Sequence, residues 1–194
     1  MDVRMGAAAD TEDLVRYLLM AGEGLFEHLF DDAYPGLTAS DALALGVGDA
    51  DSPYHYENAY LAELKGQVVG CMVAFPSEQL GLPEIAYSVL PPERLDGVRP
   101  LFERTPPSSF YINTLATDET VRRMGVGALL LDFAAELAEA AGYDNLTLHV
   151  WGDNEGALAL YKSRGFEFVE ALHIPPSPAL RHEAPMLLLR CPVV

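Results

Sequence analysis

The sequence predicts a mixed α/β (α+β) protein with one central sheet flanked by helices. Of its 194 residues, 50% are apolar, which is enough to build a buried core. Short runs of apolar and β-branched residues recur along the chain and are typical of strands, as in residues 110–117. Between these runs lie segments with apolar residues at helical spacing, of which 125–141 is the clearest. We expect a single domain that covers residues 1–194.

The first 24 residues predict a strand followed by a helix. The strand is expected at 3–9, where apolar residues are frequent. Asp10 and Thr11 are residue types that cap helix N-termini, and leucine and valine residues follow them at helical spacing. Gly22 and Gly24 predict a break or bend at the end of this helix.

A short helix and a hairpin are expected next. Ser40 is the predicted cap of a short helix that runs to Leu45. Two apolar segments, 58–64 and 67–75, are separated only by a Lys-Gly dipeptide. A two-residue spacer between such segments is typical of a β-hairpin.

The proline-rich segment 76–109 gives weaker signals. A strand or a helical turn is expected near Ile85 and a short helix near Leu101. Residues 110–117 follow as a strand rich in aromatic and β-branched residues. In the helix at 125–141, five residues are expected to share one apolar face: Leu129, Leu130, Phe133, Leu137 and Ala141.

The C-terminal part is expected to combine three strands with one helix. The strands are placed at 146–151, 166–170 and 186–190, and the helix at 154–163. A loop that contains prolines connects the last two strands. Because helices are interspersed with strands throughout the chain, one central sheet is the expected arrangement.

Charge and cysteine usage restrict the classes of function. Twelve Lys and Arg residues against 29 Asp and Glu residues give a net charge of −17, which disfavours nucleic acid and an anionic membrane surface as partners. No apolar run approaches the ~20 residues of a membrane span, and the N-terminus has no signal-peptide pattern. Cys71 and Cys191 have no metal-ligand partners at useful spacing, so we expect no metal and a cytoplasmic, reducing environment.

The linker between the central strand and the long helix predicts a phosphate site. A helix N-terminus offers unpaired backbone N–H groups and the positive end of the helix dipole. Gly125 and Gly127 let a ligand approach the backbone closely, and Arg122 and Arg123 add full positive charges. The Gly-Lys-Ser/Thr of a P-loop is absent, and Leu130 stands where a dinucleotide fold needs a third glycine. A helix start with a tight turn is the alternative interpretation of this short motif.

A second motif, DNEGALALYKSRGF, occupies residues 153–166. Together, the two motifs resemble those of the GNAT superfamily of acetyl-CoA-dependent N-acetyltransferases. Residues 122–127 match the family's Gln/Arg-x-x-Gly-x-Gly/Ala pattern, and the second motif matches Asp-Asn-x-x-Ala-x-x-Leu-Tyr-x-x-x-Gly-Phe at every fixed position. The strand at 113–117 resembles the family's Leu-Ala-Val strand, with Thr117 in place of valine. The close resemblance covers about residues 110–170.

The resemblance implies a fold and a ligand site. The sheet would be mixed and mostly antiparallel, with about seven strands, and would splay in the middle to hold acetyl-CoA. Amides of residues 123–128 would hold the pyrophosphate, strand residues would pair with the pantetheine, and Asn154 would reach the pantetheine arm. The residues implied in acetyl-CoA binding are Leu115, Ala116, Thr117, Arg122, Arg123, Met124, Gly125, Val126, Gly127, Ala128, Asn154 and Tyr161.

The resemblance also assigns Tyr161 to catalysis, as the group that faces the thioester sulfur. Reaching the neutral form of an amine with a pKa of ~10.4 costs about 4–5 kcal/mol at pH 7. Complete proton transfer from a tyrosine, with a pKa of ~10, to a thiolate, with a pKa of ~8.5, is uphill by about 2 kcal/mol. We therefore expect either a hydrogen bond to the developing thiolate or a lowered pKa for Tyr161. A packed helical aromatic is the alternative interpretation of this residue.

The sequence does not identify the general base. Tyr111 and Asn113 occupy the strand positions where relatives often hold a base or a base-linked water, so they are the predicted acceptor-side residues. Alternation places both side chains on one face of the strand. The base candidates elsewhere are Glu57, Glu84, His149 and His55, with a core position expected for His149.

The acceptor is expected to be a primary amine of a small molecule. The motifs do not distinguish aminoglycosides, polyamines, amino acids and protein N-termini as acceptors. Residues 1–63 hold two cations and 13 acids, and this field favours a cationic amine. The segments 54–57 and 173–183 are candidate borders of the acceptor cleft, with aromatic packing and a solvated loop as the respective alternatives. A catalytically silent acyl-CoA-binding module with a regulatory role is the alternative function. Because many relatives form dimers, a homodimer is left open.

Overall fold

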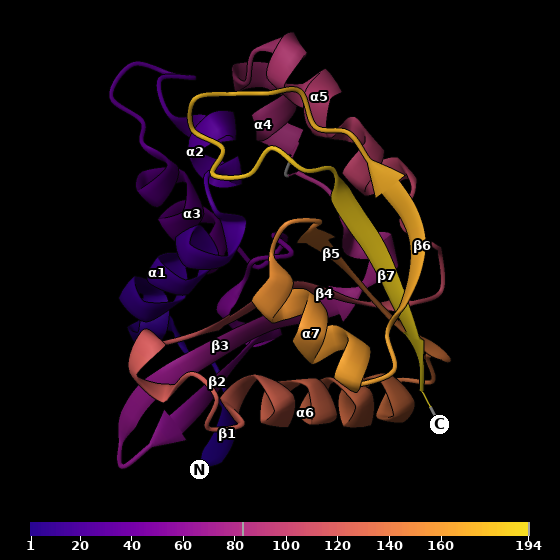
Figure 1. Ribbon diagram of the computed structural model, residues 1–194. Helices are drawn as coiled ribbons and strands as arrows, with labels where there is room; N and C mark the ends of the chain where they lie inside the picture. Colours follow the sequence, from indigo (N-terminus) through magenta and orange to yellow (C-terminus); the bar gives the residue numbers. More distant parts are fainter. Residues whose placement is uncertain (83, 194) are drawn as a thin grey trace.

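The computed structural model describes residues 1–82 and 84–193, which fold around a seven-stranded sheet (Figure 1). The strand order is β1-β2-β3-β4-β5-β7-β6, and only the β4–β5 pair is parallel. The strands are β1 (Asp2–Met5), β2 (Ala59–Leu64), β3 (Gln67–Pro76), β4 (Phe110–Thr117), β5 (Asn145–Trp151), β6 (Glu167–Leu172) and β7 (Met186–Pro192). The predicted mixed, mostly antiparallel sheet is confirmed.

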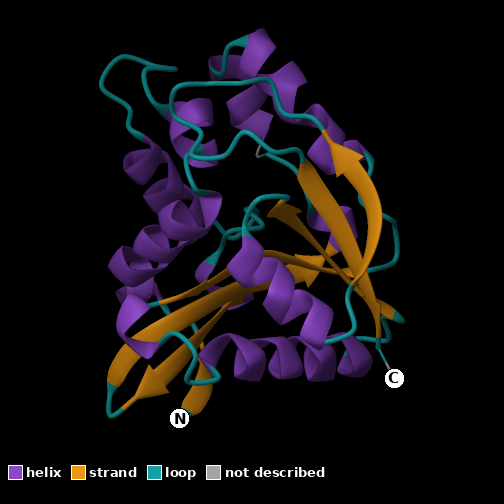
Figure 2. Ribbon diagram, viewed as in Figure 1, coloured by secondary structure: helices purple, strands orange, loops and turns teal. Residues whose placement is uncertain are grey.

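Helices cover both faces of this sheet (Figure 2). The helices are α1 (Thr11–Gly22), α2 (Leu25–Phe30), α3 (Ala39–Gly48), α4 (Glu84–Val89), α5 (Pro92–Glu103), α6 (Val126–Ala140) and α7 (Glu155–Ser163). One apolar cluster joins buried residues of α1, α2, α3 and α5 to one face. A second cluster joins α6 and α7 to the other face. The sheet thus lies between two buried clusters, which together form the core.

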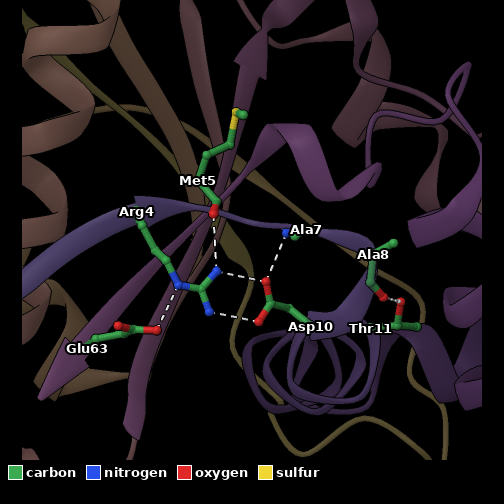
Figure 3. Close-up of polar contacts among 7 residues, drawn as sticks. All are labelled: Arg4, Met5, Ala7, Ala8, Asp10, Thr11 and Glu63. Atoms are coloured by element: carbon green, nitrogen blue, oxygen red, sulfur yellow. Dashed lines mark hydrogen bonds and ion pairs between the residues drawn. The ribbon is translucent and has the colours of Figure 1, made fainter. Parts of the chain in front are cut away.

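Arg4 of β1 fixes the chain at the start of α1 (Figure 3). Its Nη1 and Nη2 each lie 2.8 Å from a carboxylate oxygen of Asp10, and its Nε lies 2.7 Å from Oε1 of Glu63 in β2. The Arg4 guanidinium holds the pKa of the Asp10 carboxyl below its usual value. Asp10 stands at the N-cap position, but its carboxylate accepts the N–H of Ala7, which precedes a 3₁₀ turn. This turn ends β1 at Met5, so the predicted strand at 3–9 is too long.

The next segments correct one predicted helix cap. α3 begins after Thr38, whose hydroxyl accepts the N–H of Asp41 at 3.2 Å, while the Asp41 carboxylate accepts from Thr38 in return. This reciprocal pair makes Thr38 the cap in place of Ser40, which lies inside the helix. The helix also extends past Leu45 to Gly48.

The predicted hairpin is confirmed. Lys65 and Gly66 connect β2 to β3 with φ angles of 53° and 77°, and two consecutive positive angles suit the twist of a two-residue hairpin. The helical turn expected near Ile85 is α4, and the short helix expected near Leu101 is the longer α5.

α6 turns a different face to the sheet from the predicted one. Its buried residues are Val126, Leu130, Leu131, Ala134 and Ala138. Of the five residues expected to be buried together, only Leu130 is buried, and Ala141 is exposed. The small side chains of Ala134 and Ala138 let the helix backbone approach the sheet, and Phe133 at its flank packs on Tyr60 of β2 with ring centroids 5.3 Å apart. The hydrophobic pattern alone favoured the larger side chains.

The parallel contact between β4 and β5 is short. It consists of three residue pairs, and its last pair is Ile112 with Leu148. Beyond this pair β4 continues to Thr117 against β3 alone, while β5 continues to Trp151 against β7. A β-bulge at Asn113, between the pairs Thr114–Val73 and Ile112–Ala74, also bends β4. The two strands therefore diverge and form a fork in the middle of the sheet, which is the predicted splay.

In residues 1–82 and 84–193, every helix is too short or too polar to cross a bilayer.

Candidate functional site

A cleft of ≈ 880 Å³ opens at the fork between β4 and β5. Its walls come from both faces of the sheet: α1, α2 and α5 line one half, and the start of α6 and the length of α7 line the other. The two strands that separate these halves supply polar groups at the fork itself. The cleft therefore connects two compartments at the one place where the sheet is open.

The α6 half of the cleft begins with a turn of exposed backbone N–H groups. Gly125 is the N-cap of α6 with φ 88°, and a Cβ at this position would meet open space. Among the described residues we find no hydrogen-bond acceptor for the N–H groups of Arg123, Gly125, Val126, Gly127 and Ala128. The turn therefore has the donors and the positive helix end that a phosphate group needs.

The glycines of this turn also bring the two motifs together. A Cβ on Gly127 would lie 3.0 Å from Cδ2 of Leu160 in α7, and a Cβ on Gly70 of β3 would lie 2.9 Å from Cγ1 of Val126. The absence of side chains thus allows α6 to approach both α7 and the sheet. Arg122 is largely exposed and lies 3.4 Å from Glu119, so its guanidinium stands at the surface beside the turn.

Most of the residues that the sequence assigned to acetyl-CoA binding line this half of the cleft. Past the last β4–β5 pair, the edge of β4 that faces β5 has no strand partner. The lining includes Leu115, Ala116, Thr117, Arg122, Arg123, Gly125, Val126, Gly127, Ala128, Asn154 and Tyr161. Met124 is the exception, because its exposed side chain lies outside the lining.

α7 places Asn154 and Tyr161 on the cleft wall. Asn154 caps the helix, because its Oδ1 accepts the N–H of Ala157 at 3.1 Å, and its Nδ2 donates to Glu23 at 3.3 Å. Tyr161 is 7% exposed and packs against Phe166. No described residue bonds its hydroxyl, which nevertheless retains some exposure in the cleft. Burial, and secondarily the charge of Glu23, raises the pKa of Tyr161, so the alternative of a lowered pKa is not supported.

Tyr111 and His149 join β4 to β5 at the fork. The Tyr111 hydroxyl lies 2.9 Å from Nδ1 of His149, one residue beyond the last parallel pair. Nδ1 is therefore satisfied, but Nε2 of His149 has no partner among the described residues. Burial lowers the pKa of His149 to about 4 and raises that of Tyr111. At neutral pH the site thus holds a neutral imidazole whose second nitrogen is buried at the fork and has no hydrogen-bond partner among the described residues.

The Asn113 side chain lies near Tyr54 on the same side of the fork. Burial raises the pKa of Tyr54 to about 12, and the nearby Asn113 side chain opposes this shift. Tyr54 also packs edge-on against Phe26 of α2, with ring centroids 5.7 Å apart. Of the segment 54–57, only Tyr54 is part of the described cleft lining.

The other base candidates lie away from the fork. His55 is buried 3.8 Å from Glu57, and neither lines the described cleft. The side chain of Glu84 lies outside the described residues. His149 is the candidate that the fold brings to the cleft. It was expected in the core because of its position in β5, but it is part of the cleft lining.

Glu23 is a cleft residue that the sequence analysis missed. It follows α1 in a left-handed conformation with φ 49°, and its Oε2 lies 3.0 Å from Nε2 of His182. His182 stacks on Trp151 and places Nδ1 2.6 Å from Asp153. The only available signal was an acidic residue between Gly22 and Gly24 at a helix break, which does not by itself specify a site.

The loop between β6 and β7 extends from the C-terminal strands toward α2 and α5 (Figure 1). The N–H of Arg181 donates to the carbonyl of Glu23 at 3.1 Å. Gly24 packs so closely under the loop that a Cβ there would lie 1.9 Å from the carbonyl oxygen of Ala179. At the far side, Pro175 contacts the position of Gly97 in α5. The loop therefore contacts the segment after α1 and the helices α2 and α5, and it is not solvated along its whole length.

Within residues 1–82 and 84–193, His, Cys, Asp and Glu side chains form no group of three or more that could hold a metal ion.

Two curated relatives match about a third of the chain. N-alpha-acetyltransferase 50 of Danio rerio is 39% identical over 61 residues, which is 31% of this chain and 36% of that protein. N-alpha-acetyltransferase RimI of Mycobacterium tuberculosis is 39% identical over 66 residues, which is 34% of this chain and 40% of that protein. Both matches span less than half the length of the relative.

Solved structures resemble the whole chain. An N-acetyltransferase from Staphylococcus aureus Mu50 superimposes with a TM-score of 0.71 at 23% identity, over 98% of this chain and 100% of that one. Another crystal structure, described as an acetyltransferase, gives a TM-score of 0.67 at 25% identity over 100% of both chains. The family model described as "Acetyltransferase (GNAT) family" matches residues 24–166. The chain therefore belongs to the GNAT acetyltransferase family.

Proposed function

We propose that this protein transfers the acetyl group of acetyl-CoA to a primary amine by direct attack in a ternary complex. One observation carries the proposal: a single cleft connects the free N–H groups at the start of α6 to the Tyr161 hydroxyl and to the Tyr111–His149 pair. The N–H groups suit a pyrophosphate, and the polar groups at the fork suit the two proton movements of acyl transfer.

The residues of the α6 half would hold acetyl-CoA. The amides from Arg123 to Ala128 would bind the pyrophosphate, with Arg122 and Arg123 as nearby positive charges. The unpaired edge of β4, at Leu115–Thr117, would pair with the amide groups of the pantetheine in the way an added strand does. Asn154 is committed to capping α7, so only its remaining donor capacity is available to this ligand.

The reaction joins the amine nitrogen to the thioester carbonyl carbon and breaks the carbon–sulfur bond. The nitrogen gives one proton to a base, and the sulfur leaves as a thiolate that takes its proton from solvent. His149 is the proposed base, directly or through a water: in the tautomer whose Nδ1–H donates to the Tyr111 oxygen, Nε2 carries a free lone pair and has no protein partner. Tyr161 is the proposed donor to the sulfur. With a raised pKa it is fully protonated at neutral pH, and it stabilises the thiolate as a hydrogen-bond donor.

Replacement of Tyr161 with phenylalanine tests this mechanism. We expect Tyr161→Phe to lower kcat by about 10²-fold, because the developing thiolate loses its donor, while acetyl-CoA affinity changes little. Tyr143→Phe is the matched control, since Tyr143 packs on Phe110 outside the described cleft lining. The measurements are thiol release with a panel of amines and acetyl-CoA binding by calorimetry. Equal turnover in Tyr161→Phe would refute the role of Tyr161.

The same experiment separates an enzyme from a silent acyl-CoA-binding module. A silent module binds acetyl-CoA with no amine-dependent thiol release. The free Nε2 of His149 and the accessible hydroxyl of Tyr161 support the enzyme.

A further inference from the structure

The half of the cleft that faces α2 and α5 is lined almost entirely by apolar side chains. Its polar groups are confined to the fork and to one rim, where Tyr111, His149 and Glu23 lie. The apolar wall includes Leu25, Phe26 and Leu29 of α2 and Val98, Leu101 and Phe102 of α5. All six belong to, or pack against, the apolar cluster on the α1 face of the sheet.

Negative charge is scarce inside this compartment although the protein is strongly acidic. Residues 1–63 carry 13 acidic side chains, but Glu23 is the one acidic residue among the described cleft lining. The Oε2 atom of Glu23 is already engaged, because Nδ2 of Asn154 donates to it at 3.3 Å and Nε2 of His182 lies 3.0 Å from it. A ligand with a second ammonium group would therefore place that charge among apolar side chains, where it loses hydration without gaining a partner.

We propose that the acceptor is a small molecule with one primary amine on an apolar body, which occupies the compartment between α2 and α5. This inference rests on the proposed acetyl transfer and names its substrate class. The amine lies at the fork beside Tyr111 and His149, and the apolar body extends toward α2 and α5. The loop between β6 and β7 contacts Gly24 at the start of α2 and Gly97 in α5, the two helices that wall this compartment. The whole cleft has a volume of ≈ 880 Å³, and acetyl-CoA would occupy the α6 half, so the remaining space suits a small acceptor.

The apolar compartment also assists the chemistry. Desolvation favours the neutral form of an amine, so binding there lowers the pKa of the acceptor. His149, with a pKa of about 4, is a weak base and benefits from an acceptor that gives up its proton readily. The protein's overall charge of −17 still attracts a monocation from solution, so the acidic surface and the apolar interior act at successive stages.

A matched pair of amines tests the proposal. Hexylamine and cadaverine have the same number of heavy atoms, and they differ in a terminal methyl group against a second ammonium. We expect kcat/KM for hexylamine to exceed that for cadaverine by at least about tenfold, as fits the burial of apolar surface against the desolvation of a charge. Equal values, or a preference for cadaverine, would overturn the proposal.

Binding provides a readout that does not depend on turnover. Trp151 is the chain's only tryptophan and lies 3% exposed in the cleft wall, so its fluorescence reports on ligands in the compartment. With coenzyme A present, hexylamine should change this fluorescence at a concentration at least about tenfold lower than cadaverine. No change with hexylamine would overturn the proposal. If hexylamine binds selectively but no thiol is released, the acetyl transfer fails and the apolar amine site stands.

A charged side chain in the wall provides the complementary test. Leu80 is half-buried in the cleft lining, and Leu45 is 70% exposed on α3 outside that lining. Leu80→Asp should lower kcat/KM for hexylamine at least about tenfold and reduce its advantage over cadaverine, whereas Leu45→Asp should change neither value. Circular dichroism shows whether each variant is folded, and the comparison of amines on the unaltered protein does not depend on either. A folded Leu80→Asp protein with an unchanged preference would contradict the assigned compartment.

Discussion

Individual residues at the fork have properties that depend on both strands. His149 is half-buried in β5, and its Nδ1 shares a hydrogen bond with the Tyr111 hydroxyl of β4. The sequence showed that a histidine lies on a central strand, and it showed Tyr111 on a neighbouring one. It did not show that the two side chains meet, because that contact depends on the parallel register of β4 and β5. Glu23 was missed for the same reason: its partners, Asn154 and His182, lie more than 130 residues away in the chain.

Protonation of His149 should reduce stability in mild acid. The pKa is about 4 in the folded protein and ~6.5 in an unfolded chain, so the unfolded state binds more protons between these values. Stability therefore falls as pH falls from about 6.5 to about 4, by at most about 3 kcal/mol. The imidazole signal in NMR should titrate with a midpoint near 4.

The control for this prediction is His149→Gln, which cannot titrate. Urea denaturation at pH 7 and pH 5 should show a smaller loss of stability in the variant than in the unaltered protein. A midpoint near 6.5 for His149, or identical losses in both proteins, would contradict the assigned environment.

At the scale of elements, local signals predicted most of the fold. The hairpin, the strand at 110–117 and the break after α1 follow from turn glycines and apolar periodicity, which act within a few residues. The predictions were wrong where contacts between residues far apart in the sequence determine the local structure. α6 buries alanines because they allow close approach to the sheet, and β1 is shortened because Asp10 binds Arg4. The sequence of a helix does not by itself show which of its side chains will fit against the sheet.

The two ends of α6 allow a test of the phosphate turn. Gly125 and Gly142 flank the helix with φ angles of 88° and 80°, and a Cβ at either position would meet open space. Gly125→Ala and Gly142→Ala should each lose about 1 kcal/mol of stability, because alanine is strained at positive φ. Only Gly125→Ala should also weaken acetyl-CoA binding, since its methyl group lies beside the free N–H groups. Calorimetry with both variants checks this, and equal affinities would place the pyrophosphate elsewhere.

At the scale of the whole molecule, the loop between β6 and β7 links the C-terminal strands to the N-terminal helices. Neither the loop nor α1 shows this contact in its own sequence, although Gly24 is required for it. The sequence resemblance predicted the splayed sheet and most of the residues that line the α6 half of the cleft. The other half could not be predicted in the same way, because it is built from α2 and α5, which lie far apart in the chain.

Replacement of Gly24 with alanine should displace the loop. At φ 101°, and with a Cβ placed 1.9 Å from the carbonyl oxygen of Ala179, the variant must shift backbone. We expect a loss of more than about 2 kcal/mol in stability and a larger KM for the acceptor. Gly36→Ala is the control, because its φ of 79° carries similar strain and no atom lies within 4 Å of the added Cβ. Similar losses in both variants, measured by urea denaturation, would show that the loop contact contributes little.

The three residue pairs between β4 and β5 make the backbone ladder weakest at the middle of the sheet. The two parts of the sheet are thus joined at this point by few backbone hydrogen bonds, and a molecule bound in the fork would contact both strands. We expect bound acetyl-CoA to link the two strands, so that amide hydrogen exchange slows on β4 and on β5 together when acetyl-CoA binds. Protection confined to α6 would mean that acetyl-CoA binding does not stabilise the contact between β4 and β5.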